Sequence, residues 1–117
     1  MTQPNRARED VPEMTVKELA RRMELGHPLT LVDVRELHEK EIADLPDYGQ
    51  RRIPVADFLE QAETLDPSAP VVLYCRSGSR SEWATRKLLE LGHRQAWNLK
   101  GGILAWRKEI DPSLQAY

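Results

Sequence analysis

Short apolar segments alternate with helical segments along this chain, and this alternation limits the fold more than any other feature. Three segments rich in aliphatic residues are expected to be strands: 29–34 (LTLVDV), 71–75 (VVLYC) and 96–99 (AWNL). Segments with helical character surround them: 15–25, 36–43, 55–65, 81–92 and 101–110. The order predicts an α/β domain with a central, mostly parallel sheet flanked by helices on both faces.

Two spacings of Ser or Thr followed by Glu three residues later mark helix starts. Thr15 and Glu18 have the spacing of a capping box, which predicts a helix directly after Thr15. Ser79 and Glu82 have the same spacing, so the longest helix is expected to begin at residue 80 or 81. Glycines at 26 and 92 follow the apolar pattern of these helices and are expected to end them.

The length and composition indicate one globular domain. The chain has 117 residues, of which 40% are hydrophobic and 31% charged. We expect residues 1–13 to be a flexible lead-in and residues 14–117 to form the domain. No apolar run approaches the ~20 residues that a membrane span needs, and the polar N-terminus has no hydrophobic signal core. With a single cysteine, these features predict a cytoplasmic protein that is not attached to a membrane. The net charge of −2 argues against a nucleic-acid partner.

The single cysteine stands at the end of an apolar segment and is followed by RSGSRS. In an open parallel sheet, ligands bind beyond the carboxyl ends of the strands, which is where Cys75 is expected. Gly78 allows a tight turn, after which a helix begins, so successive N–H groups can surround the sulfur. Arg76 and Arg80 add positive charge. Such a loop lowers the pKa of a thiol and suits a thiolate nucleophile.

Four other interpretations fit parts of this segment. A lone cysteine after a buried strand is more often a small core residue, and a Ser/Gly/Arg loop is often a solvated turn. Cysteine phosphatases place an arginine six positions after the cysteine to hold a tetrahedral phosphate. Here Ser81 occupies that position and Arg80 comes one residue earlier, so the loop is one residue short for a phosphate. An arsenate reductase would require the longer loop or a second cysteine.

Three segments in this order resemble the rhodanese family of sulfurtransferases. They are LVDVRE (31–36), CRSGSRS (75–81) and NLKGGILAW (98–106), and the resemblance extends from about Thr15 to Trp106. It implies a rhodanese-like domain in which Cys75 is catalytic and carries sulfur as a persulfide, taken from thiosulfate or a persulfide donor, with no cofactor and no metal. It also implies that the loop binds the substrate through Arg76, Ser77, Gly78, Ser79, Arg80 and Ser81.

The last segment, GGILAWRKEIDPSLQAY, resembles the C-terminal rhodanese domain of adenylating enzymes that deliver sulfur to ubiquitin-like sulfur carriers. This likeness implies a sulfur-carrier protein or an adenylating enzyme as partner. The chain departs from the family at residues 43–48, ADLPDY, where members often have Gly-His-Ile-Pro-Gly-Ala. Because the fold also serves as a non-catalytic binding or regulatory module, that function remains an alternative.

Asp33 and Arg35 end an earlier strand, so they are expected at the same edge of the sheet as the cysteine. Asp33 either positions the loop, pairs with an arginine or caps the next helix. For Arg35 we favour a structural ion pair over a contact with substrate. The three histidines lack metal-ligand spacing and are expected at the surface. The three tryptophans are expected to pack in the core or at its rim.

Overall fold

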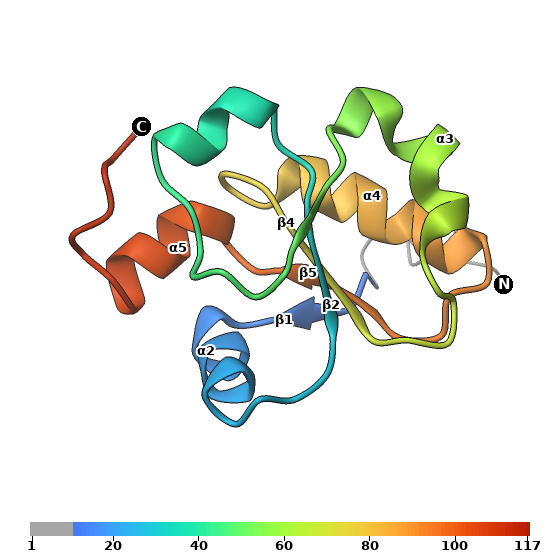
Figure 1. The fold of residues 1–117 in the computed structure, drawn as a ribbon, viewed down its shortest axis with the longest axis horizontal. Coiled ribbons are helices and arrows are strands. Elements are labelled where there is room, and N and C mark those ends of the chain that lie inside the picture. The colour runs from blue at the N-terminus through green and yellow to red at the C-terminus, as the bar shows by residue number, and fades with distance from the viewer. Residues whose placement is uncertain (1–10) are drawn as a thin grey trace, which may run out of the picture.

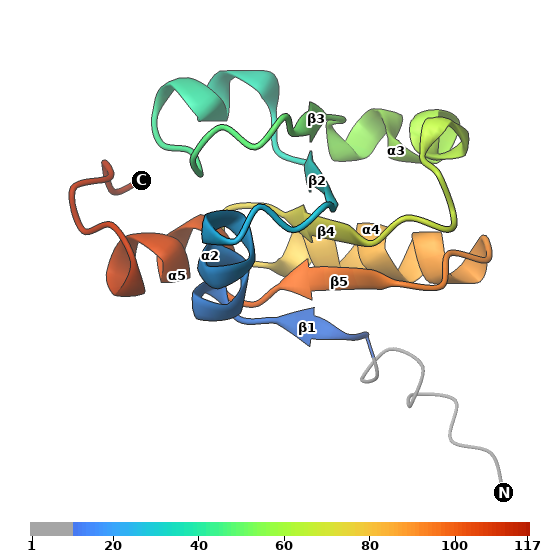
Figure 2. The ribbon, with the colours of Figure 1, turned by 60° about the horizontal axis from the view of Figure 1, so that its bottom comes forward.

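Five parallel strands form one sheet in the computed structural model, which describes residues 11–117 (Figures 1 and 2). The strands are β1 (Glu13–Met14), β2 (Thr30–Asp33), β3 (Arg51–Arg52), β4 (Val71–Tyr74) and β5 (Ala96–Leu99). Their order across the sheet is β1-β5-β4-β2-β3, and every neighbouring pair is parallel. The predicted α/β class and the three predicted strands are confirmed. The edge strands β1 and β3 were missed because two residues carry no periodic pattern.

Four α-helices cover the sheet in two layers. They are α2 (Val16–Glu24), α3 (Phe58–Gln61), α4 (Ser79–Glu90) and α5 (Gly102–Glu109). Helices α2 and α5 cover one face and α3 and α4 cover the other (Figures 1 and 2). Short 3₁₀ helices fill the two segments where longer helices were predicted: η1 (Leu37–Glu41), then η2 (Val55–Asp57) and η3 (Ala62–Thr64) on either side of α3. The Thr15 hydroxyl accepts a bond from the Glu18 N–H, which confirms the predicted cap.

The alternation of side chains along β2 and β4 divides the core into two clusters. Val32 and Leu73 point toward α3 and α4, where they pack with Phe58 and Leu88. Their sequence neighbours point to the other face, toward α2 and α5. That second cluster includes Leu31, Val72, Tyr74, Leu19, Ile103 and Trp106. Both faces of the central strands are therefore buried, and packing from both sides holds their carboxyl ends in place.

The structure differs from two expectations. His93 was expected at the surface but is buried, at 7% exposure, after the turn that ends α4. Most of the predicted lead-in lies outside the described residues, but β1 begins at Glu13, one residue before the predicted domain boundary. The three tryptophans agree with the prediction: Trp106 is buried, and Trp83 and Trp97 pack against the core.

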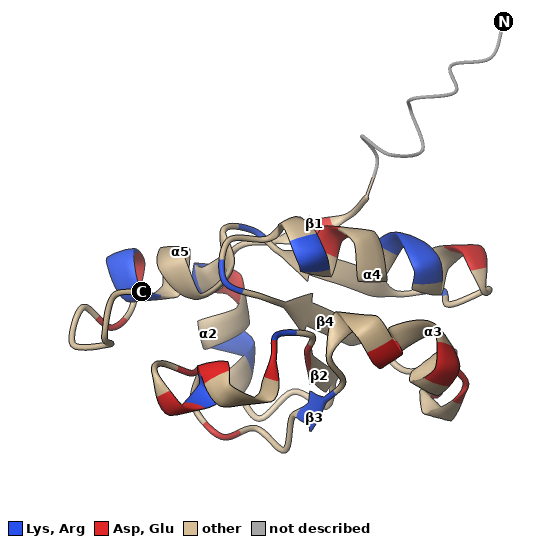
Figure 3. Cartoon of the chain, turned by 90° about the horizontal axis from the view of Figure 1, so that it is seen from above, with Lys and Arg blue, Asp and Glu red and all other residues tan. Residues whose placement is uncertain are grey.

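Acidic and basic residues are interspersed along the helices (Figure 3). Helix α4 contains both Arg86 and Glu82, which form an ion pair one turn apart. Within residues 11–117, no helix is long and apolar enough to cross a membrane.

Candidate active site

Cys75 directly follows the central strand β4 and precedes α4. The neighbouring strand β2 ends beside it, with Asp33 paired to Tyr74 in the sheet register. From β2 the chain continues outward to β3, and from β4 it continues in the other direction to β5. The loops after β2 and β4 therefore diverge at this point, which is where open parallel sheets bind ligands. The cysteine stands at the position that the sequence predicted.

Three donors surround the Cys75 sulfur. The N–H of Gly78 lies 3.1 Å from Sγ (N to S), and both the N–H and the hydroxyl oxygen of Ser81 lie 3.4 Å from it. The whole residue is buried, with 0% exposure. A charge that forms on this sulfur would meet aligned donors instead of water.

The predicted capping box at Ser79 is wrong. Helix α4 begins at Ser79, and its N-cap residue is Gly78, which has a left-handed conformation with φ of 111°. A glycine has no side chain with which to accept the free N–H groups of the first helical turn. The Cys75 sulfur takes that place, since it accepts from the N–H of Ser81, three residues after the N-cap.

The environment of the sulfur lowers the pKa of Cys75. Burial alone would raise the pKa of the thiol, but the hydroxyl and N–H of Ser81 and the N–H groups of Gly78 and Ser77 outweigh it. The positive end of the α4 dipole acts in the same direction. The loop therefore favours the thiolate, which is the nucleophilic form of cysteine.

Asn98 of β5 is a part of the site that sequence reasoning missed. Its side-chain N–H donates to the carbonyl of Gly78 at 3.1 Å, and its side-chain oxygen competes with the Cys75 sulfur for the single proton of the Ser81 hydroxyl. The amide is buried and joins the turn to the start of α4. An asparagine within a predicted strand, in a segment that otherwise buries apolar residues, was the available signal.

Helix α5 supports the cysteine loop from the other side. The N–H groups of Ile103 and Leu104 donate to the carbonyls of Cys75 and Arg76, both at 3.0 Å. A Cβ atom on Gly102 would lie 2.3 Å from the Cys75 carbonyl oxygen, so only glycine allows this approach. The first N–H groups of α5 are thus already occupied by the loop.

Asp33 and Arg35 form the expected ion pair. Asp33 Oδ1 accepts from Arg35 Nε at 2.9 Å, and Oδ2 accepts from Arg35 Nη2 at 3.0 Å. Arg35 is 1% exposed, and it also donates to the carbonyl of Ala43 and to the hydroxyl of Tyr117. Burial would lower the pKa of Arg35, but the bonds to Asp33 and Tyr117 outweigh it and raise the pKa. Arg35 is therefore a permanently charged structural centre beside the loop.

The segment that departs from the family pattern joins this network. Asp44 Oδ1 accepts from Arg35 and from the Tyr74 hydroxyl, and Asp44 Oδ2 accepts from Arg52 at 2.7 Å. Arg52 in turn donates to Asp33 at 2.7 Å. Two carboxylates and two guanidinium groups thus alternate behind the ends of β2 and β3. Asp44 and Arg52 were not predicted, because their pairing depends on how strands β2 and β3 are placed.

The side chains of the loop do not all contact the sulfur. Ser77 and Ser79 are exposed, while Arg76 and Arg80 are half-buried and bonded to other parts of the protein. Among the described residues, no cluster of His, Cys, Asp and Glu could hold a metal ion.

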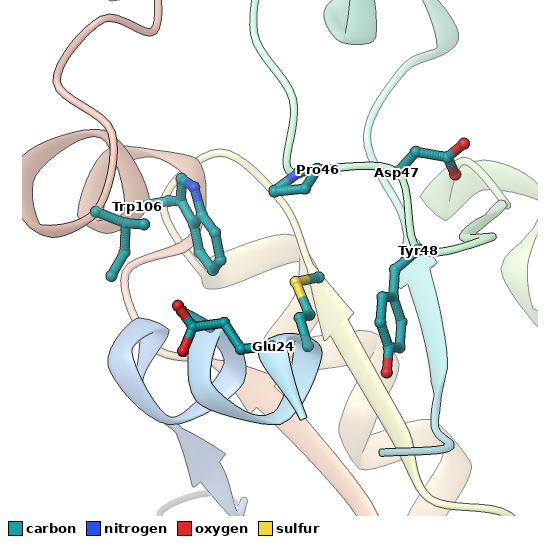
Figure 4. Close-up of a pocket in the computed structure, with 8 residues that line it drawn as sticks. Glu24, Pro46, Asp47, Tyr48 and Trp106 are labelled. Atoms are coloured by element: carbon teal, nitrogen blue, oxygen red, sulfur yellow. The ribbon is translucent and has the colours of Figure 1, made fainter. Parts of the chain in front are cut away.

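A groove of about 380 Å³ lies on the other side of the sheet (Figure 4). Trp106 and Tyr48 form opposite walls of it, and Glu24 of α2 lies at its edge. Trp106 belongs to the core cluster of α2 and α5, whereas Cys75 belongs to the cluster of α3 and α4. The groove is therefore separate from the cysteine site.

Comparison with known families agrees with this geometry. A family model described as "Rhodanese-like domain" matches residues 15–109. The chain belongs to the rhodanese-like family. Among curated proteins, it is 34% identical over 103 residues to a Bacillus subtilis protein named "Putative sulfurtransferase YtwF", covering 88% of this chain and 97% of that protein.

Larger relatives carry two activities in their names. The chain is 32% identical over 95 residues to the "Adenylyltransferase and sulfurtransferase UBA4" of Meyerozyma guilliermondii, covering 74% of this chain but 22% of that protein. It is 33% identical over 106 residues to the "Probable adenylyltransferase/sulfurtransferase MoeZ" of Mycobacterium tuberculosis, covering 89% of this chain and 26% of that one. The chain thus spans about a quarter of the length of these relatives.

Solved structures share the fold. A rhodanese-related protein from Thermoplasma volcanium superposes with a TM-score of 0.74 at 24% identity, covering 85% of this chain and 93% of the other. The human single-domain sulfurtransferase TSTD1 superposes with a TM-score of 0.72 at 25% identity, covering 85% and 97%. The resemblance predicted from the sequence is confirmed at the level of family and fold.

Replacing Ser81 with Ala should raise the pKa of Cys75, since the sulfur loses a hydroxyl donor. The pKa can be followed through the ultraviolet absorbance of the thiolate, which only Cys75 can contribute. Ser79→Ala is the matched control, because this serine is exposed in the same helical turn. An unchanged pKa in Ser81→Ala would show that the hydroxyl does not act on the sulfur.

Replacing Gly102 with Ala should destabilise the fold by about 2–3 kcal/mol beyond the cost of the backbone conformation, because the new methyl group must displace the loop. Gly26→Ala is the control: its φ of 69° is close to the 55° of Gly102, but open space surrounds it. Urea denaturation compares the two variants. Equal losses of stability would mean that α5 does not hold the loop through this contact.

Proposed function

We propose that this chain is a sulfurtransferase that carries sulfane sulfur as a persulfide on Cys75. One observation supports this most: a single buried sulfur accepts from the N–H of Gly78 and from both donors of Ser81, at the start of α4. Donors in this arrangement stabilise a negative charge on sulfur in both the free and the loaded state. The names of the relatives agree with sulfur transfer.

The proposed reaction has two steps. The Cys75 thiolate attacks the outer sulfur of thiosulfate, a new S–S bond forms, the S–S bond of the donor breaks, and sulfite leaves with the electron pair. A nucleophile such as cyanide then attacks the outer sulfur of the persulfide and leaves as thiocyanate, which regenerates the thiolate. A persulfide donor would enter the first step in the same way, with a thiolate as leaving group. The steps use no external oxidant, and general base catalysis is dispensable because the loop lowers the pKa.

The size of the loop favours sulfur over phosphate. Gly78 N already lies 3.1 Å from the Cys75 sulfur, and four residues separate Cys75 from Arg80. A phosphoryl group with three oxygens needs a wider ring of donors than a single sulfur atom does. We therefore keep a cysteine phosphatase or arsenate reductase as the weaker alternative.

A non-catalytic binding module is the second candidate, and the complete burial of Cys75 favours it. A nucleophile must be reached by its substrate, whereas a thiol that only caps a helix need not be. Capping a helix does not require a lowered pKa of the thiol, which is why we prefer catalysis.

A sulfur-carrier protein is proposed as the acceptor. Its support is the likeness to relatives named adenylyltransferase and sulfurtransferase, and to a Bacillus subtilis protein named "Putative sulfur carrier protein YrkF". In this proposal an adenylating enzyme would activate the carrier before the persulfide transfers its outer sulfur, in the cytoplasm.

Incubation with thiosulfate or a persulfide donor should add the mass of one sulfur atom to Cys75, and cyanide or a reductant should remove it. Intact-mass spectrometry measures both events. Cys75→Ser should remain folded by circular dichroism and gain nothing. Wild-type protein that never gains sulfur from either donor would refute the proposed catalysis and leave the binding module.

Inserting one glycine after Ser77 should widen the loop to the phosphatase spacing. We expect the variant to lose sulfur loading and to gain weak binding of phosphate or its analogues, because donors must lie within hydrogen-bond reach of the developing charge. Loading kinetics and phosphate titration, with circular dichroism to check folding, measure both changes. A folded variant that loads sulfur at the wild-type rate would show that loop length does not determine the chemistry.

A further inference from the structure

The hydroxyl of Ser81 has one proton and two acceptors. Its oxygen lies 3.4 Å from the Cys75 sulfur and 2.5 Å from Asn98 Oδ1. A hydroxyl donates a single hydrogen bond, so the proton can bond to the sulfur or to the amide but not to both at once. Ser81 is 0% exposed and Asn98 is 3% exposed, so bulk water does not reach this pair. The two acceptors therefore compete directly.

The Asn98 amide has only one orientation that suits its neighbours. Its nitrogen lies 3.1 Å from the carbonyl oxygen of Gly78, which can only accept a hydrogen bond. The donor end of the amide must therefore face Gly78, and the oxygen must face Ser81. The backbone of Asn98 is fixed as well, because it pairs with Leu73 of β4 on one side and with Glu13 of β1 on the other. An acceptor is thus held beside the Ser81 hydroxyl by the sheet itself.

The charge on the sulfur decides which acceptor receives the proton. When Cys75 is a thiol, the amide oxygen at 2.5 Å is the better partner, because a neutral sulfur is a weak acceptor. When Cys75 is a thiolate, a charge-assisted bond to the sulfur is the stronger one. Rotation of the hydroxyl then moves the proton from the amide toward the sulfur, and the proton stays on the Ser81 oxygen. The proton lost by the thiol passes to solvent.

The charged groups around the cysteine loop already have partners. They are Arg76 and Arg80 of the loop, Glu39 of η1, and Asp33 with Arg35 at the end of β2. The bond to Glu39 raises the pKa of Arg80. Burial alone would raise the pKa of Glu39, but bonds from Arg80, from the N–H of Glu36 and from Tyr117 outweigh it and lower the pKa to about 2. Neither Arg80 nor Glu39 changes charge where a thiol ionises, so the group that responds next to the sulfur is the Ser81 hydroxyl.

We infer that Asn98 is a positioning residue of this site: by competing for the Ser81 proton, it limits how strongly the Cys75 thiolate is stabilised. The inference rests on the proposed function, because it concerns the nucleophile of that reaction. The donors of the loop favour ionisation, and the amide opposes part of their effect. A thiolate that is less stabilised is more basic and is a stronger nucleophile once it has formed. Asn98 thus balances the amount of thiolate against its reactivity.

Asn98→Leu tests the inference, because leucine branches at the same atom and has no acceptor. The Ser81 proton is then left to the sulfur, so the pKa of Cys75 should fall, as followed through the ultraviolet absorbance of the thiolate. If Asn98 only held the turn at Gly78, its loss would loosen the donors around the sulfur and raise the pKa instead. The direction of the shift therefore separates the two roles.

Alkylation by iodoacetamide gives a second readout. The thiolate attacks the carbon, the C–I bond breaks, and iodide leaves with the electron pair, so no sulfur transfer is required. Below the midpoint of the wild-type titration, the rate in Asn98→Leu should be about threefold higher, because more thiolate is present. Well above the midpoint it should be lower, because a less basic thiolate is a weaker nucleophile. A site that was only loosened would react faster at every pH.

Thr85→Val is the matched control. Thr85 is buried in α4, and its hydroxyl donates to the main-chain oxygen of Ser81 at 2.7 Å. The variant removes a buried polar bond next to the site but leaves the Ser81 hydroxyl with the same two acceptors, so the pKa of Cys75 should not change. In a Ser81→Ala background, where no hydroxyl is left to compete for, Asn98→Leu should no longer lower the pKa.

Three results would overturn the inference. They are an unchanged or raised pKa in a folded Asn98→Leu, an equal fall in Thr85→Val, and an equal fall in the Ser81→Ala background. If Asn98→Leu does not fold, nuclear magnetic resonance of the wild-type protein decides. The Asn98 Cγ resonance should move over the pH range in which Cys75 ionises, because the amide loses its bond, and should move much less in Ser81→Ala. Equal movement in both proteins overturns the inference.

The two proposals fail separately. Wild-type protein that loads no sulfur, but in which Asn98→Leu lowers the pKa of Cys75, would refute sulfur transfer and leave the role of Asn98. Protein that loads sulfur, and in which Asn98→Leu does not lower the pKa, would refute the role of Asn98 and leave sulfur transfer.

Discussion

The bond from the N–H of Ser81 to the Cys75 sulfur is the interaction on which the site depends. It satisfies a free donor in the first turn of α4 and at the same time stabilises negative charge on the thiol. One hydrogen bond therefore stabilises both the start of α4 and the ionised nucleophile. As a result, any rearrangement of the loop also destabilises α4, the longest helix of the domain.

Much of the fold was predictable because it follows from local patterns. Strands β2, β4 and β5 lie in short segments rich in aliphatic residues, and α4 repeats its buried positions at 84, 85 and 88. Segment 55–65 also buries Phe58, Ala62 and Leu65 at helical spacing, yet it breaks into three short turns. Periodicity predicts which side chains are buried, but it does not distinguish one continuous helix from successive short ones.

The site was predictable where its residues are neighbours in the sequence or, like Asp33 and Arg35, follow a predicted parallel strand. Cys75, Gly78 and Ser81 lie within one loop, and the structure brings them together. Asn98, Glu39 and Tyr117 reach the same region from β5, from η1 and from the segment after α5. No local sequence pattern predicts that residues so far apart in the chain are in contact. The order of the strands in the sheet brings them together. The false capping box at Ser79 has a related cause: the acceptor is a sulfur three residues before the glycine that precedes the helix.

Arg35 links the sheet to parts of the chain that have no strand hydrogen bonds of their own. Its guanidinium is tied to Asp33 at the end of β2 and also holds Ala43, Asp44 and Tyr117. These three residues lie in segments without strand or α-helix, where backbone bonds alone would leave many conformations open. One buried cation with several fixed donors therefore orders irregular backbone as a hydrogen-bonded ladder orders strands. It fixes the position of each segment relative to the sheet.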